Sequence, residues 1–151
     1  MKINNAMRSN NRNIWSRRLA FQAIYSWSIN NCDVSELKSI FKLDENYKKS
    51  DNDYFIEIIT GVISNIDDID VYISALSEIN IKNINYVELN IIRCFIFELK
   101  YNRRFPKEIL LSESVKLSSK FGGQDSYKFI NAFLENFINS KYYENQWKRD
   151  Y

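Results

Sequence analysis

The chain has 151 residues, of which 45% are hydrophobic and 26% charged, as is typical of a globular protein with its own core. It contains no histidine, which excludes the commonest general base near neutral pH and the commonest metal ligand. The net charge of +2 conceals an uneven distribution, because residues 1–18 carry five basic side chains and no acidic one. A basic segment on a nearly neutral body indicates a nucleic-acid partner.

Cysteine use and hydropathy indicate where the protein works. Cys32 and Cys94 lack the spacing of a metal site, so we expect packed free thiols in a reducing compartment. Met1 opens a polar, Asn-rich stretch, and we therefore expect no signal peptide. No window approaches about 18 apolar residues without charges, so no membrane span is expected. These features predict a cytoplasmic protein.

The first expected element is a polar arm that leads into a helix. Residues 1–12 show no apolar periodicity and are predicted to form a mobile basic arm. Helical periodicity begins near Ile14 and continues to residue 30. On a helical wheel, the half opposite the apolar stripe carries Arg17, Arg18, Phe21, Gln22 and Tyr25. Two large aromatic side chains beside two arginines are unusual for a solvated face and indicate a binding surface.

The remaining helices follow from apolar periodicity and caps. In the first half we predict helices at 34–41 and 52–65 and a third helix that ends near Leu76. Ser50 or Asp51 can cap the helix at 52–65. The weakly structured residues 79–85 are expected to separate an N-terminal bundle, 13–80, from a C-terminal bundle, 81–140.

The second half contains the most apolar helix, 86–102, then one that starts near Pro106, then one at 125–140. Residues 141–151 are expected to form a frayed tail. Glu98 projects into the apolar arc of its helix and can be a structural residue with internal partners or a catalytic acid; the sequence favours the first. No β-hairpin signal is present, so we predict an all-α fold of about seven helices in two small packed bundles.

The stretch KFGGQDSYK at 120–128 holds two of the three glycines of the chain. In one interpretation it is only a tight corner, in which Gly122 adopts a left-handed conformation and Asp125 or Ser126 caps the next helix. In the other, amides of the helix start bind a phosphate together with Ser126 and Lys128. Flanking phenylalanines could then stack bases. The spacing alone leaves both interpretations open.

Four blocks of the sequence resemble the NusB family of transcription antitermination factors. They are RRLAFQAIYSW at 17–27, DYFIEIITGV at 53–62, ELNIIRCFIFEL at 88–99 and ESVKLSSKFGGQDSYKFINAFL at 113–134. The resemblance implies an all-helical fold of two small bundles without catalysis, metal or cofactor. It also implies binding to single-stranded boxA-type RNA of ribosomal RNA leaders together with the ribosomal protein NusE, within an RNA polymerase antitermination complex.

The resemblance places RNA contacts on the basic N-terminal segment, on the first long helix and at the glycine corner, and a NusE contact at Glu88. The candidate RNA-binding residues are Lys2, Arg8, Arg12, Arg17, Arg18, Tyr25, Phe121, Asp125, Ser126, Lys128 and Phe129.

The chain departs from the family where a dense arginine run is common, since RSNNRNIWSRR at 8–18 is diluted by uncharged residues. Two alternatives therefore accompany the RNA-binding hypothesis. One is a helical protein-interaction domain that has lost RNA binding. The other is a fragment of an enzyme, because such helical domains occur ahead of RNA methyltransferase domains. The length leaves no room for a cofactor-binding sheet, and no glycine-rich nucleotide motif is present, so no enzyme is expected.

Overall fold

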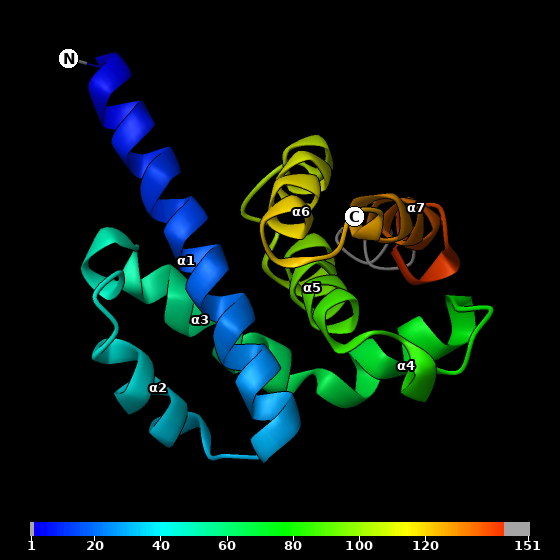
Figure 1. Ribbon diagram of the computed structural model, residues 1–151. Helices are drawn as coiled ribbons and strands as arrows, with labels where there is room; N and C mark the ends of the chain where they lie inside the picture. Colours follow the sequence, from blue (N-terminus) through cyan, green and yellow to red (C-terminus); the bar gives the residue numbers. More distant parts are fainter. Residues whose placement is uncertain (1, 144–151) are drawn as a thin grey trace. The chain divides into compact units, whose positions relative to one another are not determined.

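The computed structural model describes residues 2–143, and of residues 2–4 only the backbone. The described part is all-α and contains no strand, which confirms the predicted fold class (Figure 1). Its α-helices are α1 (Lys2–Asn30), α2 (Val34–Lys42), α3 (Asn52–Ser64), α4 (Ile66–Leu76), α5 (Tyr86–Phe97), α6 (Lys107–Phe121) and α7 (Ser126–Ile138). Single 3₁₀ turns lie at Tyr47–Lys49 and Ile81–Asn83, and a π-helical turn, Glu98–Asn102, continues α5. Among these helices none is long and apolar enough to cross a membrane.

The chain divides into two compact units, of which the first ends at Ser64 and the second begins at Asn65. Helix α4 therefore belongs to the second unit, and the division falls before the connection at 79–85 where the sequence places it. The reason is the junction between α3 and α4, which consists of Asn65 alone. So short a junction carries no loop composition from which a boundary could be predicted.

The first unit is built on the packing of α1 against α3. Helix α1 buries Leu19, Ala23 and Ile24, while α3 buries Phe55 and Ile59. At the C-terminal end of α1, Asn31 takes a left-handed conformation with φ 51°, a geometry that closes helices and that asparagine tolerates. At the start of α3, Asp51 Oδ1 accepts the Tyr54 N–H at 3.1 Å, which confirms the predicted cap.

Helix α1 begins at Lys2, so the expectation of an irregular arm up to residue 12 is wrong. Residues 5–12 are exposed and, apart from Ala6 and Met7, polar, so no apolar stripe marks them as helical. The segment also contains neither proline nor glycine, and nothing in it interrupts a helix that starts at its polar end.

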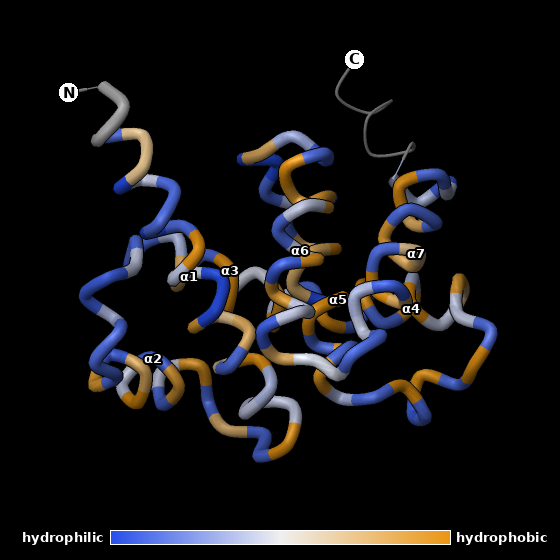
Figure 2. Tube along the Cα trace, turned by 45° about the horizontal axis from the view of Figure 1, so that its top comes forward, coloured by the Kyte–Doolittle hydropathy of each residue, from blue (hydrophilic) through white to orange (hydrophobic). Residues whose placement is uncertain are grey.

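The second unit has α5 at its centre, packed against α4, α6 and α7. Helix α5 buries most of its residues, among them Ile91 and Phe95, and α7 adds Ile130 and Phe137 to the same core. Figure 2 shows hydrophobic residues recurring along both helices. Glu98 is 1% exposed, which confirms its predicted burial, and it interacts within the chain.

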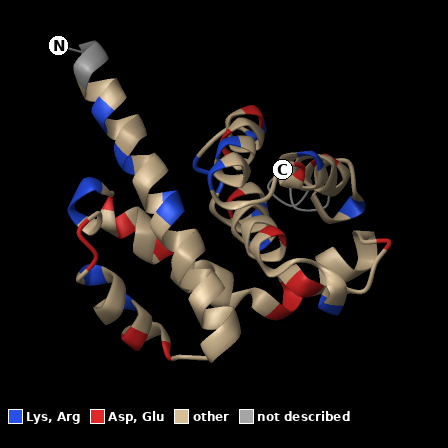
Figure 3. Cartoon of the chain, in the orientation of Figure 1, with Lys and Arg blue, Asp and Glu red and all other residues tan. Residues whose placement is uncertain are grey.

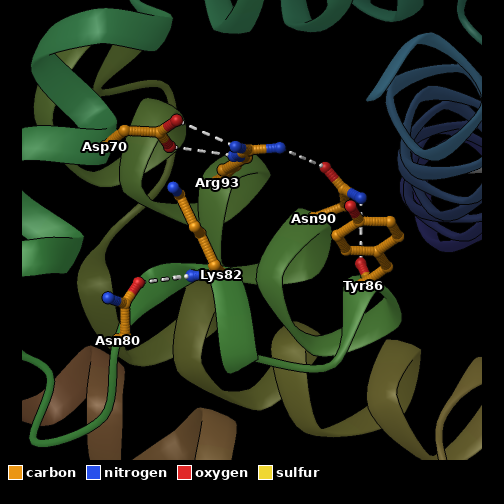
Figure 4. A network of polar contacts seen from close by, with 6 residues as sticks. All are labelled: Asp70, Asn80, Lys82, Tyr86, Asn90 and Arg93. Atoms are coloured by element: carbon orange, nitrogen blue, oxygen red, sulfur yellow. Dashed lines mark hydrogen bonds and ion pairs between the residues drawn. The ribbon is translucent and has the colours of Figure 1, made fainter. Parts of the chain in front are cut away.

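An ion pair formed by two hydrogen bonds joins α4 to α5, and two further hydrogen bonds extend it within α5 (Figure 4). Arg93 donates from Nε and Nη2 to the two carboxylate oxygens of Asp70, at 2.9 and 2.8 Å. Its Nη1 donates to Asn90 Oδ1 at 3.0 Å, and Asn90 Nδ2 donates to the Tyr86 carbonyl. Because the Arg93 side chain is only 11% exposed, these partners are what compensates the burial of its charge.

Candidate nucleic-acid interface

The glycine corner connects α6 to α7. Gly122 has φ −92° and ψ 178°, which is extended backbone, so the predicted left-handed conformation is wrong. Glycine is required at position 122 because the two helices leave no space for a side chain. A Cβ there would lie 2.6 Å from Ser126 Cβ and 2.8 Å from the Ser118 carbonyl oxygen. At Gly123 a Cβ would meet nothing nearer than Ser126 Oγ at 3.8 Å. The corner therefore needs only one of its two glycines for space.

Ser126 holds the corner from inside. Its hydroxyl accepts the Gly123 N–H at 2.9 Å and donates to Glu88 Oε1 at 3.0 Å. The residue is 7% exposed. Ser126 was a candidate phosphate ligand, but its hydroxyl is engaged within the protein because the first residue of α7 faces α5. Glu88, the candidate NusE contact, is half-buried and ties the corner to α5. We call these three residues, Glu88, Ser126 and Gly123, the corner lock.

The outer face of the corner carries the other candidates. The side chains of Asp125 and Lys128 are 76% and 66% exposed, and their charged groups lie 3.5 Å apart. Asp125 makes no side-chain cap bond to α7, so the expected capping role is wrong for this residue. Phe121 and Phe129 flank the pair and are half-buried. The corner thus presents an acid, a base and two aromatic rings on one rigid turn.

The arginines of α1 differ in exposure. Arg8 and Arg12 are exposed, and Arg18 is half-buried with its guanidinium 5.0 Å from the Trp15 ring centroid. Arg17 is only 5% exposed and lies 5.5 Å from the Tyr54 ring, so its placement on a solvated face is wrong. The buried arc of α1 is wide because α2, α3 and the Tyr47–Lys49 turn all contact it. Lys2 lies in α1, and its side chain falls outside the described residues.

Tyr25 and two lysines complete the surface on the first unit. Tyr25 is half-buried, with its ring 6.1 Å from that of Phe21. Phe21 itself is 3% exposed and belongs to the core, so its placement on a solvated face is wrong. Lys48 and Lys49 are exposed on the turn beside α1, and Lys49 Nζ lies 4.8 Å from the Trp15 ring. The sequence shows this lysine pair, but nothing in it indicates that the turn lies against α1. Figure 3 shows basic residues recurring along the exposed part of α1 and on this turn.

The titratable groups with shifted pKa values are internal. Burial raises the pKa of the Cys94 thiol to about 12, against a smaller lowering by Arg93. Burial, followed by the hydrogen bond with Tyr72, also raises the pKa of Tyr101 above its usual value. Residues 2–143 contain no cluster of three or more metal-ligating side chains. The glycine corner and the surface of α1 offer cations, aromatic rings and the Asp125 carboxylate, which suit binding.

The comparison with known proteins agrees with this geometry. A model of the NusB family matches residues 15–139, most of the chain. The chain belongs to the NusB family. The transcription antitermination protein NusB of Hahella chejuensis is 31% identical over 120 residues, 80% of each chain. The NusB of Shewanella frigidimarina is 32% identical over 126 residues, covering 83% of this chain and 94% of the relative.

Two solved structures have the same fold. T. maritima NusB superposes with a TM-score of 0.72 and 23% identity, over 88% of this chain and 94% of that one. A chain from the crystal structure of the antitermination factors NusB and NusE in complex with dsRNA gives a TM-score of 0.77 and 24% identity, over 83% and 95%. The NusB fold is therefore shown over most of this chain.

Proposed function

We propose that this NusB-family protein is a non-catalytic transcription antitermination factor. In this role it binds single-stranded boxA-type RNA of ribosomal RNA leaders together with NusE, as part of an RNA polymerase antitermination complex in the cytoplasm. The names of the relatives support antitermination, and the solved complex of NusB and NusE with dsRNA supports both partners. The observation that carries the proposal is the rigid corner with its exposed charged pair and flanking aromatic rings.

The corner supplies base contacts and one phosphate contact. Phe121 and Phe129 offer ring faces for stacking, which contributes roughly 1–3 kcal/mol per base when fully engaged. Lys128 neutralises a phosphate, and Asp125 accepts from an exocyclic amino group of a base. Because the corner lock fixes the turn before RNA arrives, little conformational entropy is lost on binding.

The α1 surface supplies further phosphate contacts on the first unit. Arg8, Arg12 and Arg18 present guanidinium groups at or near solvent, and Lys2 belongs to the same basic segment. Tyr25 offers a partly accessible ring. Buried Arg17 acts differently, since it supports the packing of α1 on α3. Each phosphate neutralised on a single strand steepens the dependence of log K on log salt by about 0.7.

Glu88 is the proposed NusE contact. One of its carboxylate oxygens accepts from Ser126, so a partner that touches Glu88 also touches the corner lock. A protein-interaction domain that has lost RNA binding is the second candidate function. The dilution of arginine over residues 8–18 favours it, while the exposed cations of the corner and of α1 favour RNA binding.

The test is the fluorescence anisotropy of a labelled boxA-like single-stranded RNA, titrated with the protein at two salt concentrations, with and without NusE. We expect salt-sensitive binding that NusE strengthens. Lys128→Ala and Arg12→Ala/Arg18→Ala should each weaken it and flatten its salt dependence. Lys82→Ala is the control, because Lys82 is an exposed cation that lies outside both surfaces. Absence of binding with NusE present would leave the protein-interaction domain as the function.

A further inference from the structure

The segment that joins α5 to α6 is strongly basic. Residues 100–107 read KYNRRFPK, with four cationic side chains and no acidic one. The segment borders a pocket of about 240 Å³, lined by Leu99, Arg103, Arg104, Phe105, Pro106, Lys107 and Tyr143. We call it the arginine pocket. It lies at the start of α6, whereas the glycine corner lies at its end, about 20 Å away along a helix of this length.

The backbone at Arg103 allows two consecutive arginines to share this pocket. Arg103 is left-handed, with φ 52° and ψ 29°. Its N–H donates to the Glu98 carbonyl, and the next N–H, of Arg104, donates to Asn102 Oδ1. Consecutive side chains of an extended chain point to opposite sides, but the reversal at Arg103 lets both line one pocket. The left-handed conformation is unfavourable for a non-glycine residue, and such strain gathers at binding sites.

The walls of the pocket increase the effect of its charges. Leu99, Phe105, Pro106 and Tyr143 contribute apolar or aromatic surface, which lowers the local dielectric constant and strengthens electrostatic attraction. The wall that Tyr143 forms is held in place through the preceding residue. Lys100 Nζ donates a hydrogen bond to the Tyr142 carbonyl and lies 4.5 Å from the Tyr72 ring centroid.

Helix α6 adds its own positive end. Pro106 is its N-cap residue, and no side chain caps the helix. Amides of the first turn and the helix dipole therefore favour an anion at this place. Glu108 is the one acidic residue of that turn, and it does not line the pocket.

We propose that the arginine pocket binds a phosphate group. Three cationic residues line it, and a guanidinium matches phosphate oxygens in a bidentate manner. Arg103 and Arg104 also interact within the chain, and five N–H donors on each guanidinium allow both uses. The volume suits one or two phosphate groups of a larger ligand. The ligand is a phosphate ester, either a small phosphorylated molecule or the RNA backbone.

Inorganic pyrophosphate is the probe, titrated into the full chain by calorimetry at low salt. We expect saturable binding to one site. Arg104→Gln/Lys107→Gln should weaken it at least about ten-fold, because charge-assisted hydrogen bonds are lost. Lys82→Gln/Lys116→Gln removes the same charge from exposed positions outside the pocket and should stay within about two-fold of the wild type.

A second variant guards against misfolding. Arg103→Asn removes one guanidinium and keeps a residue that tolerates the left-handed conformation, so it should bind pyrophosphate more weakly at an unchanged melting temperature. Titration without saturation, or equal affinity in the wild type and the double variant, would overturn the proposal.

The boxA-like RNA assay identifies the source of the phosphate. Competition between pyrophosphate and RNA, with weaker RNA binding by Arg104→Gln/Lys107→Gln, assigns the pocket to the RNA backbone. Unchanged RNA binding assigns it to a small phosphorylated ligand. Lys128→Ala distinguishes the glycine corner from the arginine pocket, since this variant should weaken RNA binding and leave pyrophosphate binding unchanged.

Discussion

Replacing Gly122 by alanine tests why the corner contains glycine. The new Cβ would lie 2.6 and 2.7 Å from Ser126 Cβ and Oγ and 2.8 Å from the Ser118 carbonyl oxygen. The last of these is a backbone atom of α6, which cannot move without shifting the helix. The dihedral angles at Gly122 suit alanine, so the whole cost is steric.

The expected loss of stability combines two effects. Overpacking of this kind costs about 1–3 kcal/mol. Displacing Ser126 also weakens its bonds to Gly123 and Glu88, each contributing about 1 kcal/mol or more. Alanine restricts the unfolded chain and returns about 0.4–1 kcal/mol. The net destabilisation of Gly122→Ala is therefore about 2–5 kcal/mol, or a melting temperature roughly 4–20 °C lower.

Urea unfolding followed by far-UV circular dichroism measures this change. Gly123→Ala is the matched control, because the nearest atom to its Cβ is 3.8 Å away, and it should be neutral or slightly stabilising. Equal stability of Gly122→Ala and Gly123→Ala would refute the steric explanation.

Four further predictions concern single side chains. Asp70→Ala leaves Arg93 largely buried without its carboxylate partner and should destabilise the protein by about 2–4 kcal/mol in urea unfolding; a loss below about 1 kcal/mol would contradict this. Thiol labelling at pH 8 should modify Cys32 and spare Cys94 until denaturant is added. Since burial raises the pKa of Cys94, its contribution to stability is fully present below the unfolded pKa near 9 and is lost as pH rises towards 12. Asp125→Ala should change the free energy of unfolding by about 0.5 kcal/mol or less, because its carboxylate caps nothing, and a loss near 1 kcal/mol would restore the capping role.

The sequence predicts most helices because local rules decide them. Helices α2 to α7 lie within a few residues of their predicted places, since each carries an apolar stripe and ends in recognisable caps or breaks. The start of α1 was missed because its first residues have no stripe. The division at Ser64 was missed because one residue makes the junction.

The candidate site was harder to predict because long-range contacts decide it. Ser126 and Glu88 are 38 positions apart, and nothing in either segment indicates that they bond. Arg17 looks solvated on a helical wheel, but Tyr54 from α3 covers it. The exposure of Asp125 and Lys128 agrees with their place at a turn.

The length of α1 has a thermodynamic consequence. Its residues from Ser16 onward are held by the core, whereas residues 5–12 have no buried side chain. A polar helical stretch without tertiary support is only marginally stable, so its amides should exchange with solvent faster than those further along α1. An anion bound near this end favours the helix through its dipole. Ligand affinity and helix content are therefore linked in this segment. Part of the free energy with which Arg8 and Arg12 bind a phosphate offsets the cost of forming the helical turns on which they lie.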